Sequence, residues 1–179
     1  MRILIFGNSG SGKTTLAKRL SKDNGLPHLD LDILAWQATE PPKRLPLLQS
    51  KAKIECFTNE QTNWIIEGCY SDLLTFVIPD ATKLYFLNPG TDVCLENCKA
   101  RPWEPHKFAT KKAQDAMLDI LLDWVRAYDT RADEFSLASH QALFRSFAGQ
   151  KHELKTRQDI GHVTLGESVH SPTKLPRSL

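Results

Sequence analysis

The residues from Gly7 to Thr14 have the types and the spacing of a loop that binds phosphate groups, Gly-Asn-Ser-Gly-Ser-Gly-Lys-Thr. Glycine takes backbone angles that a Cβ disfavours, so such a loop can turn several N–H groups toward one anion. Lys13 would bring a compact positive charge to the β- and γ-phosphates, and the Thr14 hydroxyl would be a ligand of Mg²⁺. We therefore expect ATP or GTP to bind with Mg²⁺ at Gly7, Asn8, Ser9, Gly10, Ser11, Gly12, Lys13, Thr14 and Thr15.

Two carboxylates follow at the end of a short apolar segment, in the order Asp30-Leu31-Asp32. If residues 27–31 form a strand of a parallel sheet, its carboxyl end lies at the same edge as the phosphate loop, and both side chains point one way. Asp30 would then bind Mg²⁺ through water, and Asp32 would accept the proton of a substrate hydroxyl. In the alternative interpretation, the two aspartates only solvate the strand end or cap the next turn.

A third acidic residue, Glu67, ends the apolar run Trp64-Ile65-Ile66 and precedes Gly68-Cys69-Tyr70. An acidic residue directly after a buried strand can orient water on Mg²⁺ or hold the phosphate acceptor. We assign Asp30, Asp32, Glu67, Gly68 and Tyr70 to the substrate side of the site. The alternative for Glu67 is a structural charge at a strand end.

Phosphoryl transfer also needs positive charge around the migrating group. Candidate catalytic cations are Arg101, Arg126 and Arg131, which flank a proline-containing segment and the helix expected after it. Residues 101–112 lack apolar periodicity, so we expect a lid that closes over the nucleotide, within a lid region at about 101–131. The alternative is a passive surface connection between two helices.

The segments between these residues alternate between strand and helix patterns, which predicts an α/β fold with a mainly parallel sheet between two helical layers. One domain is expected over residues 1–165, followed by a tail over 166–179. The expected strands cover 3–6, 27–31, 64–67, 83–87 and 153–155, and the expected helices cover 14–23, 43–57, 92–100, 110–128 and 136–147.

Composition narrows the function classes. The chain has 179 residues and a net charge of +2, so no overall basic field supports nucleic-acid binding. Its apolar runs are too short to span a membrane. The four cysteines show no disulfide spacing, which favours a reducing cytoplasm. Cys94 and Cys98 lie on one helix face and are expected to be buried thiols.

The chain resembles the small P-loop kinases, which include adenylate, shikimate and gluconate kinases. Four segments carry the resemblance: the phosphate loop, Asp30-Leu31-Asp32, residues 64–71 and residues 85–89. Within that superfamily the chain is most similar to the adenylate-kinase-like bacterial proteins of the FlaR type, described as DNA topology modulation proteins. The resemblance covers about residues 1–160 and implies the three-layer fold of P-loop nucleotide-binding proteins. It also implies that Lys13 and Thr14 serve ATP·Mg²⁺, that Asp30 and Asp32 serve Mg²⁺ and the acceptor hydroxyl, and that Arg101 starts the lid.

These residues predict a kinase that uses ATP and Mg²⁺ to phosphorylate a small-molecule or nucleotide acceptor. The acceptor stays open, because no Asp-Gly-Phe-Pro-Arg-like segment and no glycine-rich acceptor loop occur. A regulatory protein that binds nucleotide and hydrolyses ATP slowly is the alternative. A GTPase ranks third, because no Asn-Lys-x-Asp segment is present. The sequence leaves the oligomeric state open.

Overall fold

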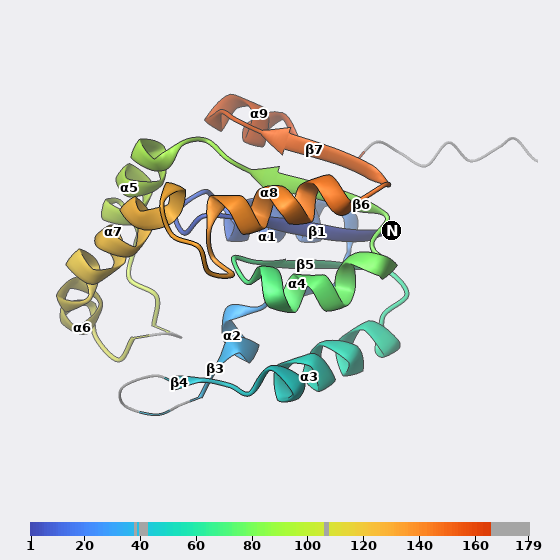
Figure 1. The fold of residues 1–179 in the computed structure, drawn as a ribbon, viewed down its shortest axis with the longest axis horizontal. Coiled ribbons are helices and arrows are strands. Elements are labelled where there is room, and N and C mark those ends of the chain that lie inside the picture. The colour runs from blue at the N-terminus through green and yellow to red at the C-terminus, as the bar shows by residue number, and fades with distance from the viewer. Residues whose placement is uncertain (38, 40–42, 106–107, 166–179) are drawn as a thin grey trace, which may run out of the picture.

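The computed structural model describes residues 1–37, 39, 43–105 and 108–165. Its centre is a sheet of five parallel strands in the order β2-β5-β1-β6-β7 (Figure 1). The strands are β1 (Arg2–Gly7), β2 (His28–Asp30), β5 (Trp64–Gly68), β6 (Lys83–Leu87) and β7 (Gln150–Leu154). Each overlaps a strand predicted from the sequence, although β7 begins three residues before the predicted 153–155, and the α/β fold with a parallel sheet is confirmed.

Helices cover both faces of the sheet because every second residue of a strand points to the same face. Ile3 and Ile5 of β1 pack with α1 (Lys13–Asn24) and α9 (Arg157–His162). Leu4 and Phe6 belong to the larger core on the opposite face. That face is covered by α3 (Leu47–Glu60), α4 (Ser71–Val77) and α8 (Leu137–Ser146), so the domain has three layers (Figure 1).

A smaller helical unit lies beside the sheet and includes the described part of residues 101–131, for which the sequence predicts a lid region, together with the helix before them. It contains α5 (Thr91–Lys99), α6 (Lys111–Ala116) and α7 (Leu118–Arg126). Cys94 and Cys98 pack against Leu122 and Val125 between α5 and α7, so the two thiols are buried. Short 3₁₀ turns follow α4 at Ile78–Asp80 and α7 at Ala127–Asp129.

The prediction of one helix over 43–57 is wrong at its start. Lys43–Arg44 forms β4, which pairs antiparallel with β3 (Trp36–Gln37) after the short helix α2 (Asp32–Ala35), and α3 begins only at Leu47. Proline favours an extended conformation in the residue before it, so Pro46 separates the strand from the helix. Pro46 occupies the N-cap of α3 with φ −52° and ψ 132°.

The helix predicted over 110–128 is divided at Met117. The Met117 N–H bonds to the Gln114 carbonyl three residues earlier, at 3.1 Å, and ψ of Met117 is −2°. This tighter turn separates α6 from α7, and such turns are common at helix ends. Gln114 also uses its side chain to bond Pro102 and Glu104, which ties α6 to the segment after α5.

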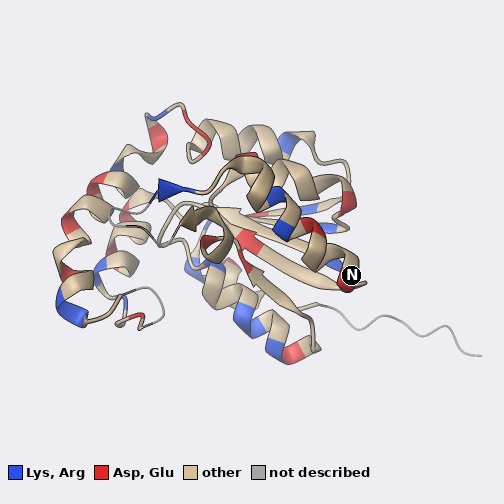
Figure 2. Cartoon of the chain, turned by 90° about the horizontal axis from the view of Figure 1, so that it is seen from below, with Lys and Arg blue, Asp and Glu red and all other residues tan. Residues whose placement is uncertain are grey.

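Charged residues of both signs are interspersed over the helices, as Figure 2 shows. In the described part of the chain, every helix is too short or too polar to cross a membrane. The predicted tail over 166–179 lies outside the described residues.

One histidine belongs to the core of the sheet. His140 of α8 has 0% exposed surface and packs beside the rings of Phe6 and Phe86. Its Nε2 lies 3.0 Å from the Cys69 carbonyl and its Nδ1 lies 2.7 Å from the Tyr128 hydroxyl. The carbonyl can only accept, so Nε2 carries the proton and Nδ1 accepts from Tyr128. Burial lowers the pKa of His140 to about 4.

The buried neutral imidazole makes stability depend on pH. Between the ordinary His pKa of 6.5 and about 4, the unfolded chain binds a proton at His140 that the folded chain does not. The free energy of unfolding should therefore fall as the pH drops through this window, by about 3 kcal/mol in total. Chemical denaturation at several pH values measures this loss. His140→Gln should remove most of the slope, whereas the exposed His152→Gln should keep it; equal slopes in all three proteins would contradict the assignment.

Candidate functional site

The phosphate loop connects β1 to α1 and depends on three glycines. Gly7, Gly10 and Gly12 have φ values of 149°, 79° and 96°, whereas no described non-glycine residue has a positive φ. Gly12 is the N-cap of α1, and Lys13 is the first residue of that helix. The loop therefore has the backbone conformation for which the sequence places glycines, directly before the positive end of a helix dipole.

Neighbouring backbone leaves no space for side chains at two of these glycines. A Cβ on Gly7 would collide with the Leu87 carbonyl oxygen at the end of β6. A Cβ on Gly10 would collide with the Cys94 carbonyl oxygen and lie 2.7 Å from Sγ of Cys98, both in α5. Asn97 of α5 also donates a hydrogen bond to the Gly10 carbonyl at 2.8 Å. The loop is thus packed directly onto β6 and α5.

The lysine of the motif is held inside the loop. Lys13 is 9% exposed, and its ammonium group donates to the Asn8 carbonyl at 2.9 Å. The Asn8 side chain donates in turn to the Val125 carbonyl of α7 at 3.2 Å. A bound phosphate would supply oxygens that can accept from the same ammonium group, which has three donors.

A cleft of about 680 Å³ opens over the loop, within the usual range of small-molecule sites. Most of the residues predicted for the site line it: Ser9, Gly10, Ser11, Gly12, Lys13, Thr14, Thr15, Asp32, Glu67 and Arg101. The first residues of the predicted lid line its outer part, namely Arg101, Pro102, Trp103, Glu104 and Pro105. The structure thus brings the loop, one of the two predicted aspartates and the lid segment to one cavity.

Asp30 and Asp32 take different positions. The expectation that both lie on one strand is wrong, because β2 ends at Asp30 and Leu31 has helical angles, φ −66° and ψ −18°. Asp32 begins α2 and lines the cleft, where its Oδ1 accepts from the Tyr70 hydroxyl at 2.7 Å. The Asp30 carboxylate accepts from the backbone N–H of Asp32 at 2.9 Å, so it stabilises the turn between β2 and α2.

Glu67 is a buried carboxylate at the base of the cleft. Its side chain is 2% exposed, and its Oε1 lies 3.7 Å from Nε2 of His28 on the neighbouring strand. This distance is too long for a hydrogen bond, and neither atom has another hydrogen-bond partner among the described residues. Gly68 follows it in close contact with Leu31, which leaves no room for a Cβ.

The remaining predicted site residues lie outside the cleft lining. Arg126 forms an ion pair with Asp123 at 2.6 Å, and about half of its side chain is exposed. Arg131 forms an ion pair with Asp133, and its guanidinium carbon lies 3.5 Å from the ring centroid of Trp124. Tyr70 is 3% exposed and contacts Asp32. Of the three predicted arginines, only Arg101 is among the described residues that line the cleft.

Other residues line the cleft without having been predicted, among them Lys18, Cys69, Asn97 and Arg157. Arg157 follows the last strand, so the rule that located Asp32 and Glu67 at strand ends could have found it. Lys18 is one helical turn after Thr14 on α1 and could have been found by helical spacing. No sequence signal marks Asn97. Burial raises the pKa of the Cys69 thiol to about 12, so Cys69 stays protonated.

The residues present fit a magnesium ion that is held mainly by phosphate oxygens and water. No group of three or more His, Cys, Asp and Glu side chains in the described chain could hold a metal ion. Mg²⁺ at nucleotide sites needs only one or two protein oxygens besides the phosphates. Thr14 lines the cleft and could supply one of them through its hydroxyl.

The chain matches no protein-family model and no curated protein. Among solved structures, it is similar to a shikimate kinase from Bacteroides thetaiotaomicron, with 20% identity, a TM-score of 0.49, and 90% and 92% of the two chains covered. It is also similar to a deoxyadenosine kinase from M. mycoides with bound dATP, with 12% identity and a TM-score of 0.49; the match covers 90% of this chain and 94% of that kinase. A third similar structure is the YorR protein from Bacillus subtilis in complex with phosphorylated GDP, with 14% identity and a TM-score of 0.48; the match covers 90% of this chain and 87% of YorR. Likeness at this level does not bear on activity or substrate.

The two inner glycines of the loop should respond differently to alanine. At Gly12 an added Cβ would meet no atom within 4 Å, so Gly12→Ala should cost only the strain of a positive φ, about 1–2 kcal/mol. At Gly10 the Cβ would also collide with α5, so Gly10→Ala should lower the free energy of unfolding by a clearly larger amount. Denaturant unfolding of both variants measures the difference; equal losses would show that the loop does not pack tightly on α5.

Proposed function

We propose that this protein catalyses ATP- and Mg²⁺-dependent phosphoryl transfer to a small-molecule or nucleotide acceptor. One observation carries the proposal: Lys13 of the phosphate loop and the carboxylate of Asp32 line the same cleft. A kinase needs a nucleotide phosphate held in place and, on its far side, a group that orients or deprotonates the acceptor hydroxyl. The membership in the small P-loop kinases, and in the FlaR type within them, rests on the sequence motifs.

In this proposal the phosphate loop holds the β- and γ-phosphates. The glycine conformations and the start of α1 give the loop backbone N–H groups and a helix N-terminus for an anion. Lys13 would exchange the Asn8 carbonyl for phosphate oxygens. Mg²⁺, held through Thr14 and the phosphates, would neutralise charge that develops on the transferred group. Asp30, which braces the turn before α2, would support this site through Asp32.

Asp32 would act on the acceptor. It lines the cleft from the start of α2, together with the loop, and an acceptor hydroxyl bound there would meet the γ-phosphate. A carboxylate there can orient the hydroxyl and accept its proton. Glu67, which lines the cleft, would bound the acceptor pocket, and Gly68 would allow Leu31 to pack closely behind it.

The segment 101–112 would close over the bound nucleotide. Arg101 lines the cleft and forms an ion pair with Glu104 at 3.3 Å, which a triphosphate could replace. The segment is anchored at one end by Gln114, whose side chain bonds the carbonyl of Pro102. Lys111 is paired with Asp115 on the exposed face of α6 and does not line the cleft. Among these cations, Arg101 is the one that we propose for the transferred phosphoryl group.

A regulatory ATPase is the second candidate, favoured by Glu67. A buried carboxylate at the base of the cleft can order a water molecule for slow hydrolysis without any acceptor. A screen of phosphate acceptors with ATP·Mg²⁺ separates the two functions. ADP release stimulated by an acceptor supports the kinase, whereas basal hydrolysis that no acceptor changes supports the regulator.

Lys13→Ala should remove the compact charge that reaches the β/γ-phosphates and should lower turnover of ATP·Mg²⁺ about 10²–10³-fold. Lys22→Ala, at the exposed end of the same helix, is the matched control and should leave turnover unchanged. Calorimetric titration with ATP·Mg²⁺ and an ADP-release assay measure both variants. Unchanged affinity together with unchanged turnover in Lys13→Ala would refute the nucleotide site.

Asp32→Asn should lower turnover about 10²-fold while ATP binding survives, because the amide cannot accept the proton of the attacking hydroxyl. The assay uses basal hydrolysis, in which water takes the place of the acceptor, and any acceptor found in the screen. Asp23→Asn, on the exposed end of α1, serves as the control. Full activity of Asp32→Asn would show that the carboxylate is structural.

A further inference from the structure

The carboxylate of Asp32 is the end of a chain of two hydrogen bonds. The Tyr70 hydroxyl donates to Oδ1 of Asp32 at 2.7 Å, and Nε1 of Trp36 donates to the Tyr70 oxygen at 2.7 Å. An indole N–H can only donate, so the Tyr70 oxygen must accept from Trp36 and give its own proton to Asp32. The direction of the chain is therefore fixed from the surface residue Trp36 to the cleft residue Asp32.

Tyr70 is suited to act on Asp32 and not on a ligand. It is 3% exposed and is absent from the residues that line the cleft. Burial raises the pKa of the Tyr70 hydroxyl far above its ordinary value, and the nearby charge of Asp32 raises it further. The hydroxyl is thus a permanent hydrogen-bond donor at any pH at which the protein would be used.

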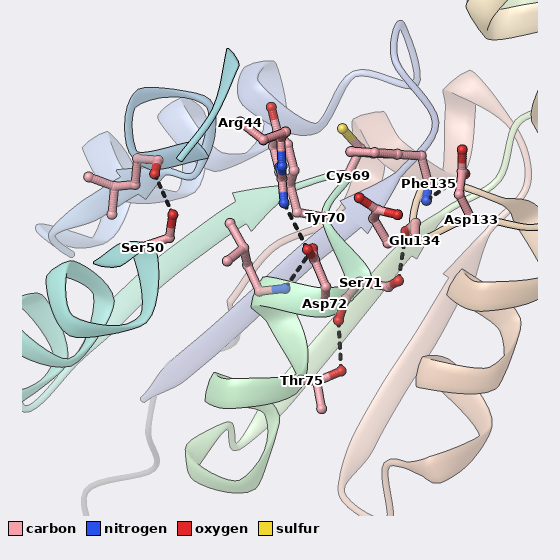
Figure 3. A network of polar contacts seen from close by, with 12 residues as sticks. Arg44, Ser50, Cys69, Tyr70, Ser71, Asp72, Thr75, Asp133, Glu134 and Phe135 are labelled. Carbon is pink, nitrogen blue, oxygen red and sulfur yellow. Dashed lines mark hydrogen bonds and ion pairs between the residues drawn. The ribbon is translucent and has the colours of Figure 1, made fainter. Parts of the chain in front are cut away.

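The ring of Tyr70 is clamped from two sides. The guanidinium carbon of Arg44, on β4, lies 4.7 Å from the ring centroid, and Arg44 is anchored by an ion pair with Asp72 at 2.8 Å. The ring of Phe135 meets Tyr70 edge-on with centroids 5.3 Å apart. Figure 3 shows Arg44 lying against Tyr70, with Asp72 at the start of α4 beside them. These contacts hold the ring in place, so the hydroxyl stays at hydrogen-bond distance from Asp32.

We propose that Tyr70 is a positioning residue that fixes the carboxylate of Asp32 in the cleft, and that Trp36 and Arg44 of the β3–β4 hairpin hold Tyr70 for this purpose. The proposal rests on the proposed role of Asp32 in phosphoryl transfer. A hydrogen bond to one oxygen of a catalytic carboxylate fixes its rotation, so its partners affect catalysis without touching the substrate. The hairpin thereby becomes part of the catalytic apparatus.

The physical link can be tested without any acceptor. In ¹⁵N-labelled protein, Trp36→Phe identifies the indole N–H signal of Trp36. Asp32→Asn should move this signal, because the amide changes the hydrogen bond that Tyr70 makes next to the indole. In a Tyr70→Phe background, Asp32→Asn should no longer move it. If the signal moves equally in both backgrounds, or in neither, the chain of hydrogen bonds does not exist in solution and the proposal is overturned.

Turnover of ATP·Mg²⁺ with water as acceptor tests the positioning role. Tyr70→Phe keeps the ring and its contacts, and should lower kcat about 10-fold with KM for ATP unchanged. In an Asp32→Asn background it should have no further effect, because the hydroxyl acts only through the carboxylate. A merely structural role would lower kcat by the same factor in both backgrounds and would overturn the proposal. Tyr85→Phe, in the core on the opposite face of the sheet, is the matched control and should leave kcat unchanged.

The outcomes separate this proposal from the proposed function. If Asp32→Asn lowers kcat and Tyr70→Phe does not, Asp32 is catalytic and the positioning role is overturned alone. If neither substitution changes kcat, the phosphoryl-transfer role of Asp32 is overturned, and the positioning role falls with it. Trp36→Phe removes the indole donor at a position that is 39% exposed and keeps an aromatic ring beside Arg44, so it tests the same link should Tyr70→Phe fold poorly. Trp36→Phe should also lower kcat, but by a smaller factor than Tyr70→Phe. An unchanged kcat would contradict the proposed role of the hairpin in holding Tyr70.

Discussion

The close approach of the phosphate loop to its neighbours is the constraint on which the rest of the structure depends. Gly7 and Gly10 lie where a single Cβ would collide with backbone carbonyls of β6 and α5, and Asn97 bonds the Gly10 carbonyl. The loop therefore fixes how the helical unit of α5 and α7 sits against the sheet. Asn8 adds a bond to α7. A loop held on so many sides presents its N–H groups without reordering, which lowers the entropic cost of binding an anion.

The strands could be predicted because both faces of the sheet are covered. A strand that is covered on both faces needs apolar residues at every position. The run of Ile3, Leu4, Ile5 and Phe6 before a glycine-rich turn has this pattern, and all four are buried. The hairpin of β3 and β4 could not be predicted in the same way. Its strands have two residues each, and Trp36 and Arg44 owe their conformation to contacts with Tyr70. Tertiary contacts of this kind leave no periodic pattern in a sequence.

The geometry of the candidate site could be predicted where it depends on the backbone, and less so where it depends on the direction of side chains. The loop requires glycine at fixed spacings, so its residues follow from the sequence. Asp30 and Asp32 have the same residue type, yet one bonds the turn and the other faces the cleft, because β2 ends between them. The arginines pose the same problem: nothing in their spacing shows that Arg131 stacks on Trp124 while Arg101 reaches the cleft.

The ion pairs indicate which cations are available to a triphosphate. Arg44 and Arg131 are each held by a carboxylate and by aromatic rings, so releasing them would cost both kinds of contact. Arg157 is paired with Glu96 in a well-exposed ion pair, and such pairs contribute only about 0–1 kcal/mol. Arg101, also in the cleft lining, is paired with Glu104, three residues away. A triphosphate over the loop could therefore recruit Arg157 and Arg101 from these pairs, which agrees with the proposed nucleotide site and with the proposed role of Asp32 toward the acceptor.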